Sequence, residues 1–110
     1  MVVERDQVVE KFREAFGKPP EIVARAPGRL EILGNHTDYN AGLVLSAAVT
    51  QSTWFALAAL PGRICRLRDD RDGAITEFSL DELASPPRRG DWTNYLKGIV
   101  RELNNRGHRV

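Results

Sequence analysis

A short polar stretch of the chain holds the residues best suited to bind a small molecule. Arg29, Asn35, His36, Asp38 and Asn40 lie within a dozen positions and offer donors and acceptors without the spacing of a metal-ligand set. A neutral polyol needs this mixture, because each sugar hydroxyl both donates and accepts a hydrogen bond, and a carboxylate can accept from two hydroxyls. The alternative is a surface loop whose polar side chains satisfy only local backbone groups.

Apolar runs on both sides of this stretch predict the strands that position it. Gly34 and Gly42 bound the polar residues and permit tight turns, so we expect a loop there. Pro27-Gly28 is typical of a break between two strands. The expected strands are Ile22–Ala26 and Leu30–Leu33 before the loop, and Leu43–Ala48 and Val49–Leu60 after it.

The remaining patterns predict a hairpin and three helices. An apolar face at Val8, Val9 and Phe12, with Gly17 after it, predicts a helix over residues 4–16. Residues 63–68 and 74–78 flank a polar turn and predict a hairpin. The capping-box pattern Ser79-Leu80-Asp81-Glu82 predicts the start of a second, short helix. A final helix is predicted between a cap at Asp91 and a closing glycine at Gly107. Its apolar stripe consists of Trp92, Leu96, Ile99, Val100 and Leu103.

This order of elements predicts an α+β fold with a mixed or antiparallel sheet and flanking helices. The chain has 110 residues, 42% hydrophobic and 28% charged, which is typical of one globular domain and argues against disorder. A net charge of +1 argues against nucleic-acid and membrane partners. A single cysteine, Cys65, favours a reducing compartment, so we expect a cytoplasmic protein.

Two motifs resemble those of the galactokinases, which belong to a larger group of small-metabolite kinases (the GHMP kinases). The first runs from Ala26 to Leu45 and reads APGRLEILGNHTDYNAGLVL, close to the family pattern A-P-G-R-x-N-L-I-G-E-H-x-D-Y-x-x-G-x-V-L. The second, WTNYLKG, runs from Trp92 to Gly98 and resembles W-x-N-Y-V-K-G. The resemblance implies the fold of that group, which it shares with a ribosomal protein domain, and ATP-dependent phosphorylation of a sugar.

The resemblance also implies roles for individual residues. His36 and Asp38 match the positions that hydrogen-bond the sugar, and Arg29 matches the arginine beside the reacting hydroxyl, where its charge stabilises the transferring phosphoryl group. Trp92 matches a position near the nucleotide base, although core packing is an equal interpretation. For Tyr95 we favour packing.

Two departures from the family pattern bear on the substrate. Asn35 stands where the family has a glutamate that holds a hydroxyl on the exocyclic carbon of the sugar, and Glu31 stands where the family has an asparagine. Glu31 compensates for the missing glutamate at position 35 if its side chain points into the same pocket. The alternative is that Glu31 is a buried partner of an arginine. Loss of the glutamate at position 35 would also remove a clash with a uronate carboxylate. Galactose, galacturonate and an amino sugar therefore remain open as substrates.

Residues 1–110 match only the N-terminal, sugar-binding part of the family. The Gly/Ser-rich phosphate loop and the catalytic aspartate have no counterpart here, so we expect a truncated segment that is inactive alone and that could self-associate through exposed apolar surface. ATP and Mg²⁺ are expected to be held mainly by the rest of the parent protein, and we expect no metal site in this segment. A non-catalytic sugar sensor is the alternative to a kinase.

Overall fold

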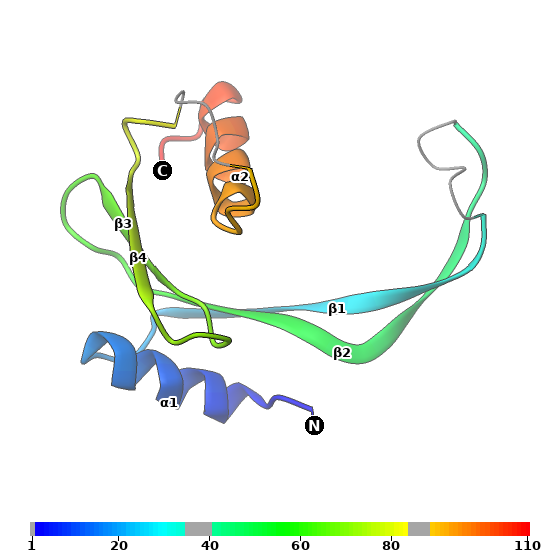
Figure 1. The fold of residues 1–110 in the computed structure, drawn as a ribbon, viewed down its shortest axis with the longest axis horizontal. Helices are drawn as coiled ribbons and strands as arrows, with labels where there is room; N and C mark the ends of the chain where they lie inside the picture. Colours follow the sequence, from blue (N-terminus) through cyan, green and yellow to red (C-terminus); the bar gives the residue numbers. More distant parts are fainter. Residues whose placement is uncertain (1, 35–40, 84–88) are drawn as a thin grey trace. The chain divides into compact units, whose positions relative to one another are not determined.

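A computed structural model describes residues 2–34, 41–83 and 89–110 of the chain (Figure 1). The chain divides into two compact units, Met1–Ala59 and Leu60–Val110, which are described separately. Within the described ranges no helix is long and apolar enough to cross a lipid bilayer. The first unit contains α1 (Arg5–Phe16), β1 (Ile22–Leu33) and β2 (Leu45–Leu57), and the second contains β3 (Ile64–Arg68), β4 (Ile75–Ser79) and α2 (Asn94–Asn105).

These elements confirm the predicted α+β class, with antiparallel pairing throughout the described strands. β1 pairs with β2 and β3 pairs with β4, so the strands form two separate two-stranded sheets. The predicted first helix is confirmed as α1. It begins after Glu4, whose backbone N–H donates to Gln7 Oε1 at 2.9 Å. It ends at Gly17, which has a left-handed φ of 74° and donates its N–H to the Arg13 carbonyl at 2.8 Å.

The first unit is a long β1–β2 ribbon with α1 beside one of its ends. Figure 1 shows α1 next to the end where β1 begins, and α1 contacts β2 there. The side of the ribbon that carries Val23, Trp54 and Ala56 is half-buried. The apolar face of α1, with Val8 and Phe12, is half-buried as well. The helix therefore covers one side of this end of the ribbon and orders the strands that lead to the polar stretch.

The prediction of separate strands on each side of Pro27-Gly28 is wrong, because β1 runs without interruption from Ile22 to Leu33. Proline lacks a backbone N–H, so it is tolerated in a strand at an edge or an irregularity. β1 pairs with β2 alone among the described strands, and its register shifts between Pro27 and Arg29. The two strands predicted after the loop are likewise one strand, β2.

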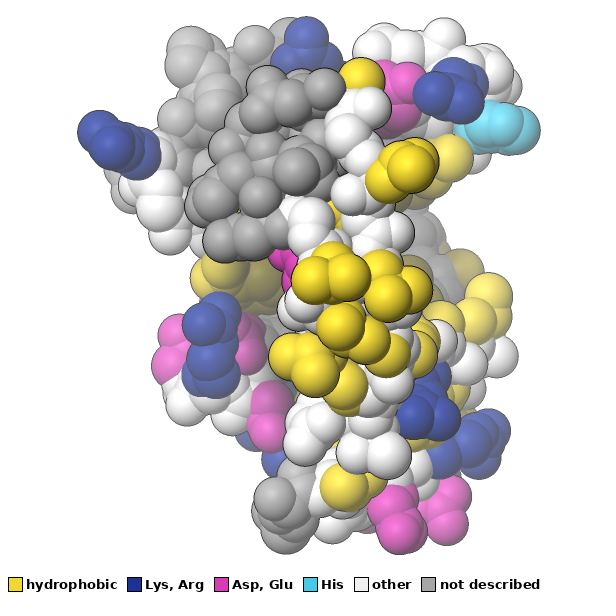
Figure 2. Space-filling view, turned by 90° about the vertical axis from the view of Figure 1, so that its right-hand side faces the viewer, with side chains coloured by type: hydrophobic (Ala, Val, Ile, Leu, Met, Phe, Trp, Pro, Cys, Tyr) yellow, Lys and Arg dark blue, Asp and Glu magenta, His cyan; other side chains and the backbone are white. Residues whose placement is uncertain are grey.

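Apolar side chains remain exposed where β1 ends and β2 begins. Figure 2 shows hydrophobic side chains gathered on one face of the chain. No described residue of the first unit is buried, so its ribbon has no core of its own. The exposed apolar residues at this end of the ribbon are Leu30, Ile32, Leu33, Leu43, Val44 and Leu45.

The predicted hairpin of the second unit is confirmed as β3 and β4. Its side chains alternate: Cys65 and Phe78, which are cross-strand partners, are half-buried on one face, and Arg66 pairs with Glu77 on the exposed face at 3.1 Å. In the connecting turn, the Asp69 carboxylate accepts hydrogen bonds from the Arg71 backbone N–H at 3.0 Å and from Arg71 Nε at 2.7 Å.

The predicted short helix from Ser79 does not form within the described residues 79–83. Ser79 is the last residue of β4 and pairs with Ile64. Its hydroxyl instead accepts from the N–H of Asp81 at 3.2 Å, two residues on rather than three. The rest of that prediction falls on residues outside the described ranges.

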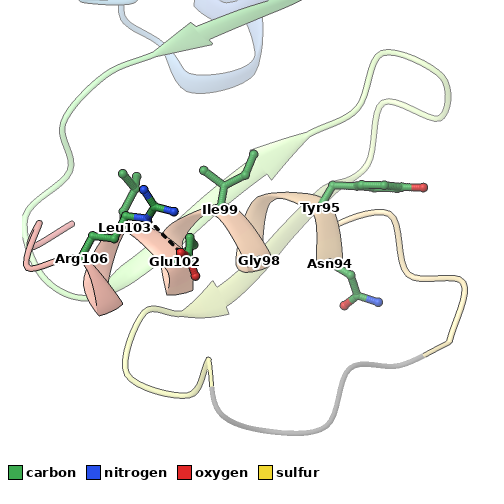
Figure 3. Close-up of a pocket in the computed structure, with 7 residues that line it drawn as sticks. All are labelled: Asn94, Tyr95, Gly98, Ile99, Glu102, Leu103 and Arg106. Carbon is green, nitrogen blue, oxygen red and sulfur yellow. Dashed lines mark hydrogen bonds and ion pairs between the residues drawn. The ribbon is translucent and has the colours of Figure 1, made fainter. Parts of the chain in front are cut away.

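The final predicted helix is confirmed as α2, but its apolar stripe is only partly covered. Asp91 Oδ1 accepts from the N–H and hydroxyl of Thr93 at 2.9 and 2.7 Å, and Gly107 follows the last turn with a φ of 85°. Val100 and Thr93 are the buried residues of the described chain. Leu96 is half-buried beside them, whereas Ile99 and Leu103 are exposed (Figure 3). The stripe of α2 is thus covered along the edge that carries Val100 and uncovered along the edge that carries Ile99.

Candidate functional site

Arg29 and Glu31 lie in a regular stretch of β1 between two irregularities. The register shifts between Pro27 and Arg29 and again between Glu31 and Leu33. Between the shifts, Arg29 pairs with Ala48 and Glu31 with Ser46. Because side chains alternate along a strand, residues two apart point to the same side of the ribbon. The guanidinium of Arg29 and the carboxylate of Glu31 therefore face the same way, and both residues are exposed.

Within the part of the chain that the structure describes, neither of these side chains forms an ion pair or a hydrogen bond. The prediction that Glu31 is the buried partner of an arginine is therefore wrong for the described residues. An exposed guanidinium and an exposed carboxylate on one side of a ribbon can bind a ligand that both donates and accepts hydrogen bonds. This pair is the described part of the predicted site.

Gly28 fixes the strand geometry immediately before Arg29. Opposite it, β2 has three residues between Ala48 and Ser52 where β1 has only Gly28 between Pro27 and Arg29. A Cβ on Gly28 would lie 3.2 Å from the Gln51 carbonyl oxygen and 3.2 Å from Val49 Cγ2. Glycine is therefore required here for close approach of the backbone, not for a turn.

Arg25 is the residue of this region that sequence reasoning missed. Its Nε donates to Ser52 Oγ at 2.8 Å and one terminal nitrogen donates to the Thr50 carbonyl at 3.4 Å. The Ser52 hydroxyl also donates to the Thr50 carbonyl at 3.0 Å, and the Arg25 guanidinium lies 5.8 Å from the centre of the Trp54 ring. Arg25 thus holds the irregular segment of β2 that packs on Gly28. The available signal was an arginine inside an apolar strand pattern.

The other predicted sugar-binding residues, Asn35, His36 and Asp38, lie outside the described residues. The described chain reaches Gly34 at the end of β1 and resumes at Ala41, whose φ is 57°. The two ends of the paired ribbon, Leu33 and Leu45, are register partners. The intervening segment is therefore attached at the end of the ribbon, two positions beyond Glu31 along the strand. Convergence of these side chains on a ligand stays a prediction.

Trp92 and Tyr95 belong to the second unit and differ in exposure. Trp92 is half-buried just before α2, which is compatible with both core packing and a base contact. The prediction that Tyr95 packs is wrong, because its side chain is 82% exposed. Position 95 falls on the uncovered side of α2 with Ile99, one turn further on. The stripe predicted from the sequence includes Ile99, so the sequence predicts that this side of the helix packs in the core.

Comparison with known proteins assigns the ribbon to a sugar-binding class. The model of a galactokinase galactose-binding signature matches residues 10–59, a range that includes β1, β2 and the polar stretch between them. The signature therefore covers Arg29, Glu31, Asn35, His36 and Asp38.

Curated relatives of the chain belong to one family within that class. A galactokinase of Clostridium perfringens (strain 13 / Type A) is 38% identical over 111 residues, covering 98% of this chain, and a galactokinase of Chloroflexus aggregans is 36% identical over 100 residues, covering 91%. By its signature and these relatives, the chain is similar to an N-terminal segment of the galactokinases. It spans 28% and 25% of the length of these two relatives.

Proposed function

We propose that the complete protein phosphorylates the anomeric hydroxyl of galactose with ATP. The hydroxyl oxygen attacks the γ-phosphorus, the bond from that phosphorus to the β,γ-bridging oxygen breaks, and ADP leaves. The hydroxyl proton passes to a carboxylate, which we expect to lie outside residues 1–110. The observation that carries the proposal is the galactose-binding signature over residues 10–59, together with galactokinase relatives along almost the whole chain.

In this proposal the polar stretch orients the sugar and Arg29 supports the transfer. Asn35, His36 and Asp38 hydrogen-bond the ring hydroxyls, and a carboxylate such as Asp38 accepts from two of them. Arg29 stabilises the charge that develops on the transferring phosphoryl group. Its exposure and lack of a partner among the described residues support this role, because its charge is available to a ligand. Trp92 lies near the base of the bound nucleotide in this proposal.

Glu31 supports galactose over galacturonate as the substrate. The family glutamate is absent at position 35, but Glu31 faces the same side of the ribbon as Arg29. A carboxylate on that side can accept the hydrogen bond of the exocyclic hydroxyl, as the missing glutamate would. The same charge would repel a uronate. We therefore infer that Glu31 compensates for Asn35.

The proposal extends to the setting of the segment. Residues 1–110 form part of a GHMP-kinase-like domain, and ATP and Mg²⁺ bind mainly to the remainder of the protein. The chain by itself does not transfer phosphate. We place the protein in the cytoplasm because its only cysteine in this segment, Cys65, favours a reducing compartment.

The test is a comparison of galactose and galacturonate with the complete protein and ATP, following ADP release. We expect turnover of galactose and little of galacturonate, and we expect Glu31→Gln to narrow that preference by weakening galactose turnover. Preferential turnover of galacturonate would contradict the assignment of the sugar. Binding of galactose without ADP release under any condition would instead indicate a sugar sensor.

A further inference from the structure

Residues 49–51 of β2, which we call the bulge, lie directly beside the part of β1 that carries Arg29. Between Pro27 and Arg29, β1 has a single residue. Between their register partners, Ser52 and Ala48, β2 has three. Extra residues interrupt the hydrogen-bond ladder and bend the strand that contains them, and Figure 1 shows β2 bent where β1 runs more evenly. The bulge therefore needs hydrogen bonds from outside the ladder if it is to keep one conformation.

The side chain of Arg25 provides such bonds. Its Nε donates to Ser52 Oγ at 2.8 Å, and one terminal nitrogen donates to the Thr50 carbonyl at 3.4 Å. The same carbonyl accepts the Ser52 hydroxyl at 3.0 Å, so three groups are joined in one network. The Arg25 guanidinium also lies 5.8 Å from the centre of the Trp54 ring, within the range of a cation–π contact. Because a guanidinium holds its donors in a rigid plane, it fixes both acceptors relative to each other.

The bulge adjoins Arg29 on two sides. Within β1, Gly28 precedes Arg29, and a Cβ on Gly28 would lie 3.2 Å from both the Gln51 carbonyl oxygen and Val49 Cγ2. Across the ribbon, Ala48 is the register partner of Arg29 and is the residue next to the bulge in β2. A shift of the bulge would therefore reach the backbone of Arg29 through the residue before it and through the residue opposite it.

The backbone has a large share in directing Arg29, because this side chain has no hydrogen bond or ion pair among the described residues. A charged group assists phosphoryl transfer only when it meets the developing charge in the right place. A misplacement of about 1 Å can reduce the rate by about 10²-fold. Any contact that fixes the backbone at this point of β1 is therefore expected to affect the reaction.

We propose that Arg25 is a positioning residue for Arg29. By fixing the bulge, Arg25 sets the direction in which the Arg29 guanidinium leaves β1, and it acts on the reaction through Arg29 and not by contacting the substrate. The inference rests on the proposed function, in which Arg29 stabilises the charge on the transferring phosphoryl group. It adds a second arginine to that mechanism, with a role that differs from the first.

The test is a double-mutant cycle in the complete protein with ATP and galactose, built from Arg25→Met and Arg29→Met. We expect Arg25→Met to lower kcat by about tenfold, with little change in KM for galactose, because the transition state depends most on the placement of Arg29. In the Arg29→Met background the same change should alter kcat by about twofold or less, since sites that act through one group are not additive. The comparison is measurable because Arg29→Met should leave about one part in 10²–10³ of the rate.

Lys18→Met is the matched control. Lys18 Nζ donates to the Ala59 carbonyl at 2.9 Å, so this change also removes a bond from a cationic side chain to a backbone carbonyl of the same unit, but at the end of the ribbon away from Arg29. It should leave kcat unchanged. Far-UV circular dichroism checks the folding of each variant. If Arg25→Met does not fold, Ser52→Ala removes the hydroxyl that Arg25 Nε bonds, and it should give a smaller loss of kcat that also disappears with Arg29→Met.

Equal losses of kcat in the two backgrounds would overturn the inference, because Arg25 would then stabilise the fold without acting through Arg29. An unchanged kcat with Arg25→Met, or an equal loss with Lys18→Met, would overturn it as well. In these three cases, phosphorylation of galactose by the wild-type protein would leave the proposed function standing. A wild-type protein that does not phosphorylate galactose would contradict the proposed function, and the inference would fall with it.

Discussion

Arg29 combines a fixed charge with freedom from any structural partner among the described residues. Arginine keeps its charge at every accessible pH. Structural arginines in this chain are tied down, as Arg25 is by Ser52 and by the Thr50 carbonyl. Arg29 lies four positions further along the same strand, exposed and without a partner among the described residues. The contrast between these two residues supports a functional role for one and a structural role for the other.

We predict that Arg29→Met lowers kcat of the complete protein by about 10²–10³ with a smaller change in KM for the sugar. The reason is that loss of one charge-stabilising group weakens the transition state more than the bound substrate. Steady-state kinetics measure this split, and Arg101→Met serves as the exposed-arginine control. An unchanged kcat would remove Arg29 from the proposed mechanism.

Gly28→Ala is expected to destabilise the ribbon by about 1 kcal/mol or somewhat more, the range of mild overpacking. The new Cβ would press on the Gln51 carbonyl oxygen and on Val49, and the hydrogen bonds of Arg25 to Ser52 and to the Thr50 carbonyl limit how far this segment can move. Amide hydrogen exchange of β1 and β2 measures the loss. The control is Gly98→Ala, where the added methyl meets nothing and should stabilise α2 of the free chain by about 1 kcal/mol. Equal effects at both glycines would contradict this.

Cys65 is expected to react slowly with alkylating agents. Burial on the inner face of the β3–β4 hairpin raises the pKa of its thiol above the ordinary value, and only the thiolate is the nucleophile. At pH 8.5 iodoacetamide should therefore modify the folded chain several-fold more slowly than the same chain in urea. Mass spectrometry of timed samples gives both rates. Matching rates would mean that the thiol is not shielded.

At the scale of the elements, local patterns predicted α1, α2 and the β3–β4 hairpin because the signals for these elements are local. The left-handed Gly17 after Phe16 and the polar turn between β3 and β4 act on neighbouring residues only. Pro27-Gly28 misled because its effect depends on the partner strand: the irregular segment of β2 accommodates both residues. Ser79 misled because a serine hydroxyl also accepts backbone hydrogen bonds in turns, as Ser79 does from Asp81.

The β3–β4 turn should lose stability in acid through Asp69. Hydrogen bonds from the side chain and then the backbone N–H of Arg71 lower the pKa of the Asp69 carboxyl below its ordinary value. A lowered folded pKa means that the stabilisation is fully present above the unfolded value of about 3.9 and is lost as the pH falls through the folded value.

NMR titration of the Asp69 carboxyl measures this shift directly. We expect Arg71→Gln to raise the pKa of Asp69 only part of the way to its ordinary value, because the backbone N–H of residue 71 still donates to the carboxylate. The charge of Asp72 also interacts with Arg71, although Asp72 does not hydrogen-bond Asp69 in the described turn. Asp72→Asn is therefore the control and should leave the pKa of Asp69 low. A pKa of Asp69 that is ordinary in the unmodified chain would contradict the description of this turn.

At the scale of the whole molecule, the family could be predicted from sequence, whereas the packing of the chain could not. Signature motifs are contiguous, so they were visible without coordinates. The exposure of Tyr95, Ile99 and Leu103 was not, because helical periodicity identifies the apolar stripe but not how much of it meets the hairpin. The role of Arg25 was hidden similarly, because its partners lie 25 and 27 residues away along the chain.

The unequal pairing around Gly28 also constrains how the length of this segment can vary. Three residues of β2 lie opposite a single residue of β1, so β2 has two extra residues here. Because side chains alternate between the two faces of a strand, an even number of extra residues keeps Ser52 and Ala48 on the same faces as their partners Pro27 and Arg29. Removing two residues from 49–51 would leave every other cross-strand pair intact. Removing one would turn the side chains of one half of the strand to the opposite face. Natural length variants of segment 49–51 should therefore differ in steps of two residues.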